Sequence, residues 1–452
     1  MKTQSMNTTH IVIVIILSIA LILFSTEPLR AEPDAINASI MFFLRTSPST
    51  QANAMGQTYG NTFHNSPMAS IFHPASLGLF ARGNNFGHSF YIGKVDRAPE
   101  FMIDHWYDAS CTALGFNLKD YSDIPVSIGL GFHEVYQNQG LIFSRREDRW
   151  ERNTQSGERS SNYDRSKGTT ISVAFDYIAR VSFGHTWKKA ELHRWLLDVE
   201  NPATELLVKT DATDFGFIVE IPLVPLLKNI VTEIEEPLPN TKFYFDPGFF
   251  YSKTNIAEKV STTEGNRQYP LPRMVSLGIN LKTGLSYLIG SDEIKLLGFN
   301  WSQELDETLI KSSEDHSTAH TRGLQDIRLF ENLILGIAND KVDAFKQGFE
   351  INFADCFYLR HGRYENNEEG IKFTSKGWGI NYTEIVRLPL KLFSKKENWL
   401  FHVIKNLSLE QHHSEYETKP MFMFDGSEFP NPFEGIKYNS YVIRFRIVEN
   451  KS

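Results

Sequence analysis

Cysteine is scarce in this sequence, since Cys111 and Cys356 are the only two among 452 residues. Two cysteines so far apart cannot build a disulfide framework, and we expect two free thiols. The chain also lacks an excess of basic residues, because its formal net charge is -8 and its isoelectric point is about 6.0. A nucleic-acid-binding protein would present a basic face, so we expect no nucleic-acid partner.

Long apolar runs are equally rare. The only continuous one extends from Ile11 to Phe24, about 14 residues, whereas a helix needs roughly 20 residues to cross a bilayer. Together with the mean hydropathy of -0.30, this excludes a bundle of membrane helices. The run follows Lys2 and precedes the small residue Ala31, so we interpret residues 1–31 as a secretory signal peptide. An uncleaved membrane anchor is the alternative.

Short segments of alternating polarity are frequent in the rest of the chain. Five of them place apolar residues at every second position, namely Val126–Phe132, Val275–Leu281, Phe349–Phe353, Trp378–Tyr382 and Tyr441–Ile447. A period of two gives a strand one apolar and one polar face. A soluble β-sandwich would show the same alternation and is the alternative. The secretion signal and segments of about ten residues, the length of a tilted membrane-crossing strand, favour an outer-membrane β-barrel.

Fourteen such segments can be counted. They lie near residues 86–94, 109–118, 124–137, 168–178, 179–187, 212–221, 241–252, 273–282, 294–304, 347–354, 356–364, 374–386, 401–416 and 436–448. An even number of strands lets a bacterial barrel close, which hydrocarbon requires because it cannot satisfy an open sheet edge. Short and long connections alternate, as expected of periplasmic turns and extracellular loops, although residues 221–240 break the rule. The sequence therefore predicts an all-β fold, a transmembrane antiparallel β-barrel of 14 strands over residues 84–452.

Three stretches in the expected connections have helical spacing of their apolar residues. They are Leu192, Trp195, Leu196 and Val199; Leu226, Leu227, Ile230, Val231 and Ile234; and Ile327, Phe330, Leu333, Ile334 and Ile337. We expect small helices that pack over the barrel rim. Helices that lie in the membrane interface or bind a partner are the alternative.

The segment from Phe42 to Ala81 differs from the strands, because it is apolar but rich in Gly, Pro, Ser and Asn and keeps no regular period. Such a segment must fold onto another part of the chain. It contains three blocks, Phe43-Leu44-Arg45, Ala54-Met55-Gly56 and His73-Pro74-Ala75-Ser76-Leu77. These blocks resemble the N-terminal hatch of the PorV family, the outer-membrane barrels of type IX secretion. In that family the usual sequence motifs are FLR, A-x-x-MG and NPA-x-L. That family is itself similar to the long-chain fatty acid transporters of Gram-negative outer membranes.

Further blocks of the resemblance lie later in the chain. They are Phe349-Glu350-Ile351, Tyr358-Leu359-Arg360-His361-Gly362, Phe373-Thr374, Gly377-Trp378-Gly379 and Pro270-Leu271-Pro272. In the family the hatch enters the lumen of a 14-stranded barrel, so the resemblance implies that residues 32–83 form a hatch or plug. His73 stands where the family has Asn. Since neutral imidazole can both donate and accept, we expect His73 to hydrogen-bond within the plug or to the barrel wall. A position in water at the periplasmic rim is the alternative.

The resemblance implies an accessory protein of type IX secretion. Such a protein accepts the C-terminal signal domain of an exported cargo from the translocon and passes it to the surface-attachment machinery, so secreted cargo proteins and the translocon would be its partners. The alternative function is a transporter or channel for hydrophobic small molecules such as fatty acids, with the hatch as gate. Either function implies the outer membrane of a Gram-negative-type bacterium, in contact with its lipids and lipopolysaccharide.

Residues for catalysis or metal binding are not apparent. His412 and His413 are adjacent and point to opposite faces of a strand, and no nucleophile elbow, phosphate loop or dinucleotide fingerprint occurs. Ser127 and His133 share a predicted face but lie about 20 Å apart at strand rise, too far for nucleophile and base. We therefore expect no enzyme and no cofactor. Four charged residues fall on predicted lumen faces, where the arginines would pair with lumen carboxylates or with polar groups of the hatch: Glu350, Arg360, Arg444 and Arg446. Binding of an anionic ligand by the three arginines is the alternative.

Overall fold

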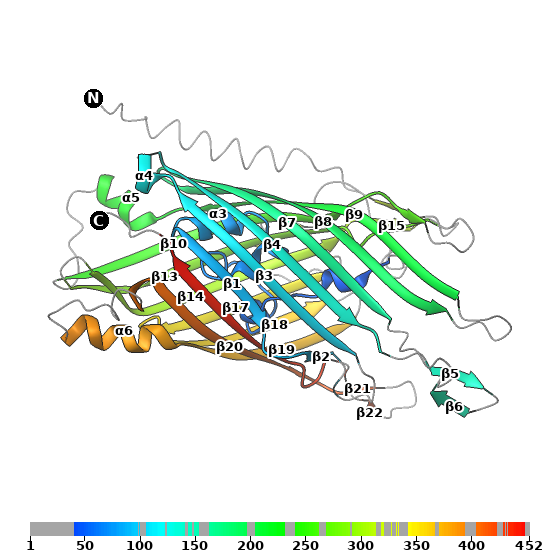
Figure 1. Ribbon diagram of the computed structural model, residues 1–452. Coiled ribbons are helices and arrows are strands. Elements are labelled where there is room, and N and C mark those ends of the chain that lie inside the picture. The colour runs from blue at the N-terminus through cyan, green and yellow to red at the C-terminus, as the bar shows by residue number, and fades with distance from the viewer. Residues whose placement is uncertain are drawn as a thin grey trace.

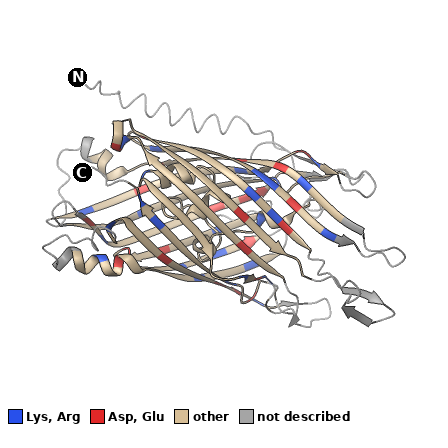
Figure 2. Cartoon of the chain, viewed as in Figure 1, with Lys and Arg blue, Asp and Glu red and all other residues tan. Residues whose placement is uncertain are grey.

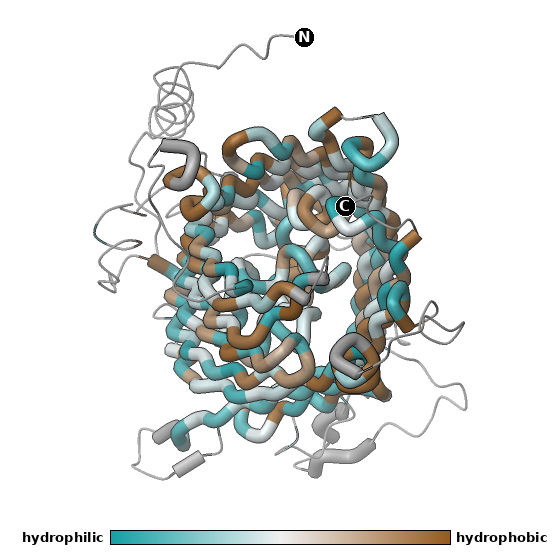
Figure 3. The backbone as a smooth tube through the Cα atoms, turned by 90° about the vertical axis from the view of Figure 1, so that its left-hand side faces the viewer, coloured by the Kyte–Doolittle hydropathy of each residue, from teal (hydrophilic) through white to brown (hydrophobic). Residues whose placement is uncertain are grey.

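The computed structural model describes residues 40–447, apart from 98, 100–104, 123, 141–142, 147–148, 153–161, 197–203, 231–239, 262–267, 290–291, 313–317, 321–326, 328–330, 332, 334–341, 367–369, 394–403, 423–427, 430 and 432. The described chain forms one large antiparallel sheet that closes on itself (Figures 1 and 3). Closure occurs because β1 (Asn85–Tyr91) pairs with β23 (Lys437–Arg446) on one side and with β3 (Trp106–Asn117) on the other. The signal peptide expected at residues 1–31 lies outside the described residues.

Fourteen strands make up the closed barrel; a two-residue strand, β2 (Val95–Asp96), only adds to the edge of β3. Besides β1, β3 and β23, the barrel strands are β4 (Val126–Asn138), β7 (Tyr163–Asp176), β8 (Arg180–Leu196), β9 (Thr204–Glu220), β10 (Thr241–Ile256), β13 (Met274–Ile289), β14 (Asp292–Thr308), β17 (Ala344–Phe353), β18 (Phe357–Asn366), β19 (Ile371–Asn381) and β20 (Leu407–Thr418). Each overlaps one of the fourteen segments that the sequence predicts. The barrel and its strand number are thus confirmed, and the sandwich is excluded.

The alternation of polarity separates an outer from an inner face, as predicted. On β4, Ile128 and Phe132 are exposed on the outside, whereas Ser127 and His133 are buried inside. Toward the extracellular end of β13 and β14 the outer face is covered. There Leu277 and Leu305 are buried because Ile327 and Leu333, from the connection that precedes β17, pack over them.

One strand prediction and one helix prediction need correction. The twelfth predicted strand extends to residue 386 and is wrong at its end. The strand stops at Asn381, and α6 (Tyr382–Phe393) begins there. Asn381 stops the strand as a helix cap, since its Oδ1 accepts from the Glu384 amide at 3.1 Å. The first helical stretch, at Leu192, is wrong as well, because Leu192 lies in β8 and pairs with Asp164 and Val208 on the neighbouring strands.

The second helical stretch is confirmed as far as the structure describes it, because α5 (Leu223–Ile230) contains Leu226, Leu227 and Ile230. Most of the third stretch, from Ile327 to Ile337, lies outside the described residues. No helix in the described part of the chain is long and apolar enough to cross a bilayer.

The two ends of the barrel differ. One end carries short turns and the helices α4 (Lys119–Ser122), α5 and α6; the other carries short hairpins (Figure 1). The hairpins are β5 (Phe143–Arg146) with β6 (Arg149–Arg152), β11 (Val260–Ser261) with β12 (Gln268–Tyr269), β15 (Ile310–Ser312) with β16 (Thr318–His320), and β21 (Met421–Phe422) with β22 (Glu428–Phe429). Because outer-membrane barrels have short periplasmic turns and long extracellular loops, we take the helix-bearing end as periplasmic.

The outer face carries an apolar band nearer the periplasmic end. On β7 the exposed Ile171 and Phe175 lie in this band, and the charged Arg165 and Lys167 follow toward the extracellular end. Figure 2 shows charged residues of this wall in the half nearer the hairpins. Such a band is what lipid contact requires.

We predict that Ile171→Arg hinders barrel assembly, since an arginine in the middle of the bilayer costs about 2–4 kcal/mol. Lys167→Arg, on the same face of β7 but above the apolar band, is the matched control and should assemble normally. Heat-modifiable migration on gels reports the folded fraction. Equal assembly of both variants would contradict the position of the band.

Candidate functional site: the occupied barrel lumen

The N-terminal segment from Ile40 to Asn84 runs inside the barrel from one end to the other (Figures 1 and 3). At the extracellular end, the Ile40 amide donates to the Pro270 carbonyl at 3.1 Å. At the periplasmic end, Asn84 donates to the Asp120 carboxylate on α4 at 2.5 Å. Between them lie four short helices, η2 (Phe42–Arg45), α2 (Thr50–Asn53), η3 (Pro67–Ile71) and α3 (Ser76–Ala81). That this segment works as a hatch stays a prediction.

Side chains of the strands satisfy the backbone of this segment. The Gly56 amide donates to Ser375 Oγ at 2.8 Å, and the Gly78 amide donates to Ser172 Oγ at 2.9 Å. The Ala75 carbonyl accepts from Ser182 Oγ at 2.6 Å. Buried amides and carbonyls without partners would be costly, so these serines allow an irregular segment to lie in the lumen.

Glycines of the barrel wall admit the segment at close range. A Cβ at Gly362 would overlap the backbone of Met55 and Gly56, and a Cβ at Gly129 would overlap the carbonyl of Leu77. A Cβ at Gly184 would likewise overlap the backbone of Pro74 and Ala75. The MG and PA-x-L residues of the sequence motif therefore lie where the segment presses against the wall.

His73 is buried against this wall, with only 2% of its surface exposed. Its ring packs on Phe63 and Phe250, with centroids 4.7 and 5.6 Å away. Neither ring nitrogen makes a hydrogen bond of good geometry within the described residues, although backbone groups of His73 itself and of Tyr251 lie near the ring. Because burial in an apolar site disfavours a charge, the ring acts as a neutral aromatic packing group.

We predict that His73→Leu leaves the unfolding temperature of the barrel nearly unchanged, because it removes two buried polar atoms that lack partners. His73→Asp should lower that temperature strongly, since it buries a carboxylate in an apolar site. Heat-dependent gel migration measures both. If leucine were as damaging as aspartate, the imidazole would have a polar role in the lumen.

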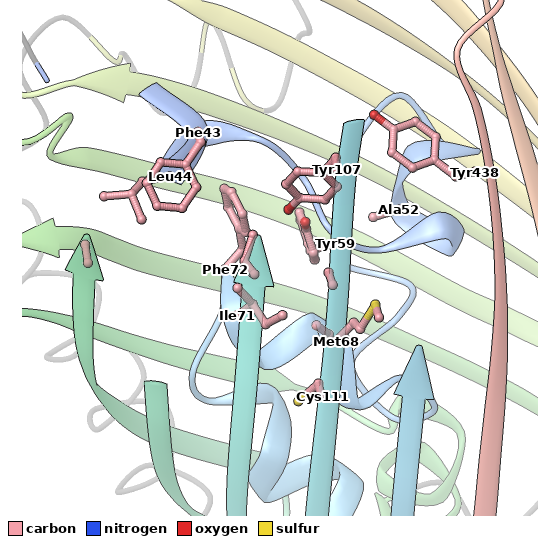
Figure 4. Packing of buried hydrophobic residues seen from close by; sticks show 14 of the residues in the cluster. Phe43, Leu44, Ala52, Tyr59, Met68, Ile71, Phe72, Tyr107, Cys111 and Tyr438 are labelled. Atoms are coloured by element: carbon pink, nitrogen blue, oxygen red, sulfur yellow. The ribbon is translucent and has the colours of Figure 1, made fainter. Parts of the chain in front are cut away.

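The extracellular half of the lumen contains an apolar layer (Figure 4). Phe43 and Leu44 of the FLR block, both buried, face Ile71 and Phe72 of the same segment and Tyr107 and Val135 of the wall. Arg45 is half-buried beside them. The space left between these groups is about 20 Å³, enough for about one water molecule. No organic solute fits there.

Tyrosines anchor the segment around this layer. Tyr91 donates from its hydroxyl to the Pro48 carbonyl at 2.6 Å, and Tyr107 donates to the Thr46 carbonyl at 3.3 Å. Tyr59, which stacks on Phe72 with centroids 5.3 Å apart, shares a hydrogen bond of 2.6 Å with Ser47. Aromatic rings thus supply the apolar surface, while their hydroxyls satisfy the backbone.

A buried ion network holds the middle of the segment. Lys346 Nζ lies 3.2 Å from Glu304 Oε1 and 2.5 Å from Asp306 Oδ2, and all three side chains are nearly inaccessible. The other oxygen of Glu304 accepts from the Tyr59 amide at 3.0 Å. Glu304 lies on β14 and Lys346 lies on β17. The hydrogen bond from the Tyr59 amide to Glu304 therefore links the segment to both strands.

Three of the four charged residues expected in the lumen belong to a second network. Arg360 Nε donates to Glu350 Oε2 at 2.7 Å, and Arg444 pairs with Glu410 and also donates to Asn65 at 3.1 Å. His412 connects the two pairs and contacts Gln51 of the segment at 2.7 Å. Arg446, the fourth, lines a pocket at the periplasmic end together with Arg444.

Several lumen residues are not found by reasoning from the sequence. His64 contacts Glu220 at 2.7 Å, and Lys282 lies 2.6 Å from the same carboxylate. Lys346 falls just outside the predicted tenth strand, and Glu304 lies at the end of the ninth. A charged residue on the inner face of a predicted strand is the signal for such pairs, but the sequence does not say which charge meets which.

No group of three or more His, Cys, Asp or Glu within the described residues could hold a metal. His412 lies inside the barrel and His413 outside, where it contacts Asn439 at 2.9 Å. The two cysteines are free, as expected, and both are buried.

Comparisons with known proteins give little beyond the fold class. No family model matches the sequence, and no curated protein matches it. A Pseudomonas aeruginosa FadL homologue is 11% identical, and the alignment covers 91% of this chain and 100% of that chain with a TM-score of 0.36. The P. putida toluene transporter TodX is 11% identical, and the alignment covers 88% of this chain and 97% of that chain with a TM-score of 0.36. The β domain of the Bordetella autotransporter BrkA is 8% identical, and the alignment covers 80% of this chain and 98% of that chain with a TM-score of 0.35.

Such identities and TM-scores carry no argument about function. The closed sheet with its apolar outer band and polar network inside decides the location, because only helices and closed barrels can span a bilayer. The protein is an outer-membrane β-barrel.

We predict that Lys346→Met destabilises this barrel, because it leaves Glu304 and Asp306 buried without a counter-charge. Removal of one partner from a buried ion pair typically costs about 3–5 kcal/mol. The unfolding midpoint should fall, and proteases should cut near Tyr59 more readily. The matched control is Lys376→Met, because Lys376 pairs with Glu417 on the exposed outer face. Equal effects of the two substitutions would contradict the role of the network.

Proposed function

We propose that this barrel is a gated channel for hydrophobic small molecules, with the segment Ile40–Asn84 as the gate. The observation that supports the proposal is the apolar layer in the extracellular half of the lumen. Six apolar side chains line its space, beside five polar ones: Phe43, Leu44, Ile71, Phe72, Tyr107 and Val135, with Thr46, His133, Ser166, Lys188 and Thr254. Water-filled porins have a polar interior. Apolar walls with a few polar groups are instead typical of sites for small hydrophobic ligands.

Passage requires the gate to move. The space in the apolar layer is about 20 Å³, so no solute enters while Phe43 and Phe72 stay in place. The layer lies between η2 and the end of η3 on one side and β3, β4, β7, β8 and β10 on the other. A hydrophobic solute that replaced these side chains would exchange one set of apolar contacts for another, which keeps the cost of opening low.

The secretion function is the second candidate, and its support is the resemblance of the three N-terminal blocks. Phe43, Leu44, Met55 and Leu77 from these blocks are all buried within the lumen. They therefore account for the packing of the segment, and a cargo domain would bind elsewhere, at the hairpin end. Secreted proteins that share a C-terminal domain should co-purify with the detergent-solubilised protein if this function is correct. Recovery of lipid or fatty acid alone would count against it.

A disulfide across the gate tests the channel. Ser70 Oγ on η3 lies 3.6 Å from Cys111 Sγ on β3, so a cysteine at position 70 is close enough for a bond after small side-chain adjustments. In a Cys356→Ser background, oxidised Ser70→Cys should lose uptake of a hydrophobic fluorophore into cells with an intact lipopolysaccharide layer. Reduction should restore the uptake rate to that of the parent.

The matched control is Ser70→Cys with Cys111→Ser, which cannot form the bond and should respond to neither oxidation nor reduction. Peptide mapping verifies that the bond has formed. Unchanged uptake in cells whose barrels carry the bond would refute a gate that moves away from β3.

A further inference from the structure

A polar pocket of about 180 Å³ lies at the periplasmic end of the lumen. Its walls come from distant parts of the chain: Asn65 of the N-terminal segment, the turn at Asp355, α6, the start of β20 and the end of β23. None of its lining residues lines the apolar layer. It is therefore a different site from the one that the channel proposal uses.

Positive charge predominates in the pocket. Five cationic side chains line it, against the two carboxylates of Asp355 and Glu384: Lys295, Arg387, Lys405, Arg444 and Arg446. Both carboxylates are already engaged, because Lys295 lies 3.5 Å from Asp355 and Arg387 pairs with Glu384. Like charges gathered around one pocket repel each other, and an anion bound between them would offset this repulsion.

Arg446 is exposed, and its side chain makes no direct ion pair with any residue that the structure describes. Arg444 has Glu410 and Asn65, and Arg387 also donates to the carbonyls of Ile404 and Leu407 at 2.7 Å. The nearest charges of opposite sign that act on Arg446 are the carboxylates of Glu384 and Asp120, without direct contact. Its guanidinium therefore has its donors available to an incoming oxyanion, for which the arginine fork is well suited.

The helix beside the pocket indicates where the anion would come from. On α6, Glu384 and Arg387 face the pocket, while Tyr382, Ile385 and Val386 are exposed apolar residues. Their spacing of three and four makes one stripe, as in helices that lie in a membrane interface. An exposed apolar stripe at the periplasmic rim lies at the level of the phospholipid headgroups of the inner leaflet.

We propose that this pocket binds a phosphate group, with Arg446 as its principal ligand and Arg387, Lys405 and Arg444 as supporting charges. The phosphate belongs either to a phospholipid headgroup or to a free ion. Binding needs no movement of the gate, so the site is independent of the channel proposal. An equilibrium binding measurement can therefore test it.

The experiment uses the full-length protein in detergent and two probes, inorganic phosphate and a water-soluble short-chain phosphatidic acid. Isothermal titration should show that Arg446→Gln weakens binding by about tenfold, a loss of one charge-assisted contact, equivalent to about 1.4 kcal/mol. Arg446→Lys, which keeps the charge, should recover part of the affinity. The matched control is Arg363→Gln, since Arg363 is exposed on the outer face near the extracellular end and pairs with Glu365.

Two results support the site and distinguish its sources. Arginine-dependent binding of both probes indicates a site for free phosphate as well as headgroups, and binding of the phosphatidic acid alone indicates a lipid site. Two results overturn the proposal: neither probe binds, or Arg446→Gln binds as tightly as the parent and the Arg363→Gln control. Gel migration confirms that each variant is folded before titration.

Discussion

Closure of the sheet between β1 and β23 is the interaction on which the rest of this structure depends. Hydrocarbon offers backbone amides no hydrogen-bonding partner, so a membrane sheet is stable only when its two edges meet. Once closed, fourteen strands enclose more space than their own inward side chains fill. The N-terminal segment occupies that space, and its irregular backbone must find its partners on the strands, as Gly56 does at Ser375 and Gly78 at Ser172.

The lumen is organised in layers along the barrel axis. Toward the extracellular end, aromatic and aliphatic side chains of the segment meet Tyr107 and Val135. Near the extracellular ends of β14 and β17, the carboxylates of Glu304 and Asp306 are held by Lys346. Tyr59 belongs to both groups, because its ring stacks on Phe72 and its amide donates to Glu304. The periplasmic end is basic at Arg446.

Reasoning from the sequence identified every barrel strand because a period of two is a local property. The period also predicts which side chains face lipid and which face the lumen. Phe132 is exposed on the outer face and His133 is buried inside, as the alternation requires. The same reasoning failed where a local pattern fits two structures. The alternation at Trp378 and Ile380 continues to Tyr382, yet the Asn381 side chain caps a helix there. Leu192 has helical spacing with its neighbours, but pairing with β7 and β9 keeps it in a strand.

The sequence by itself determined the class of fold, the faces of the strands and the segment that cannot be a strand. These properties depend on residues near one another in the chain. Only the tertiary structure decided which charges meet, because Lys346 and Tyr59 are far apart in sequence and reach the same Glu304 through register and closure. It also decided that His73 packs as an aromatic ring. The residues that surround a buried side chain come from separate strands, and their distances are set by packing, which no local period records.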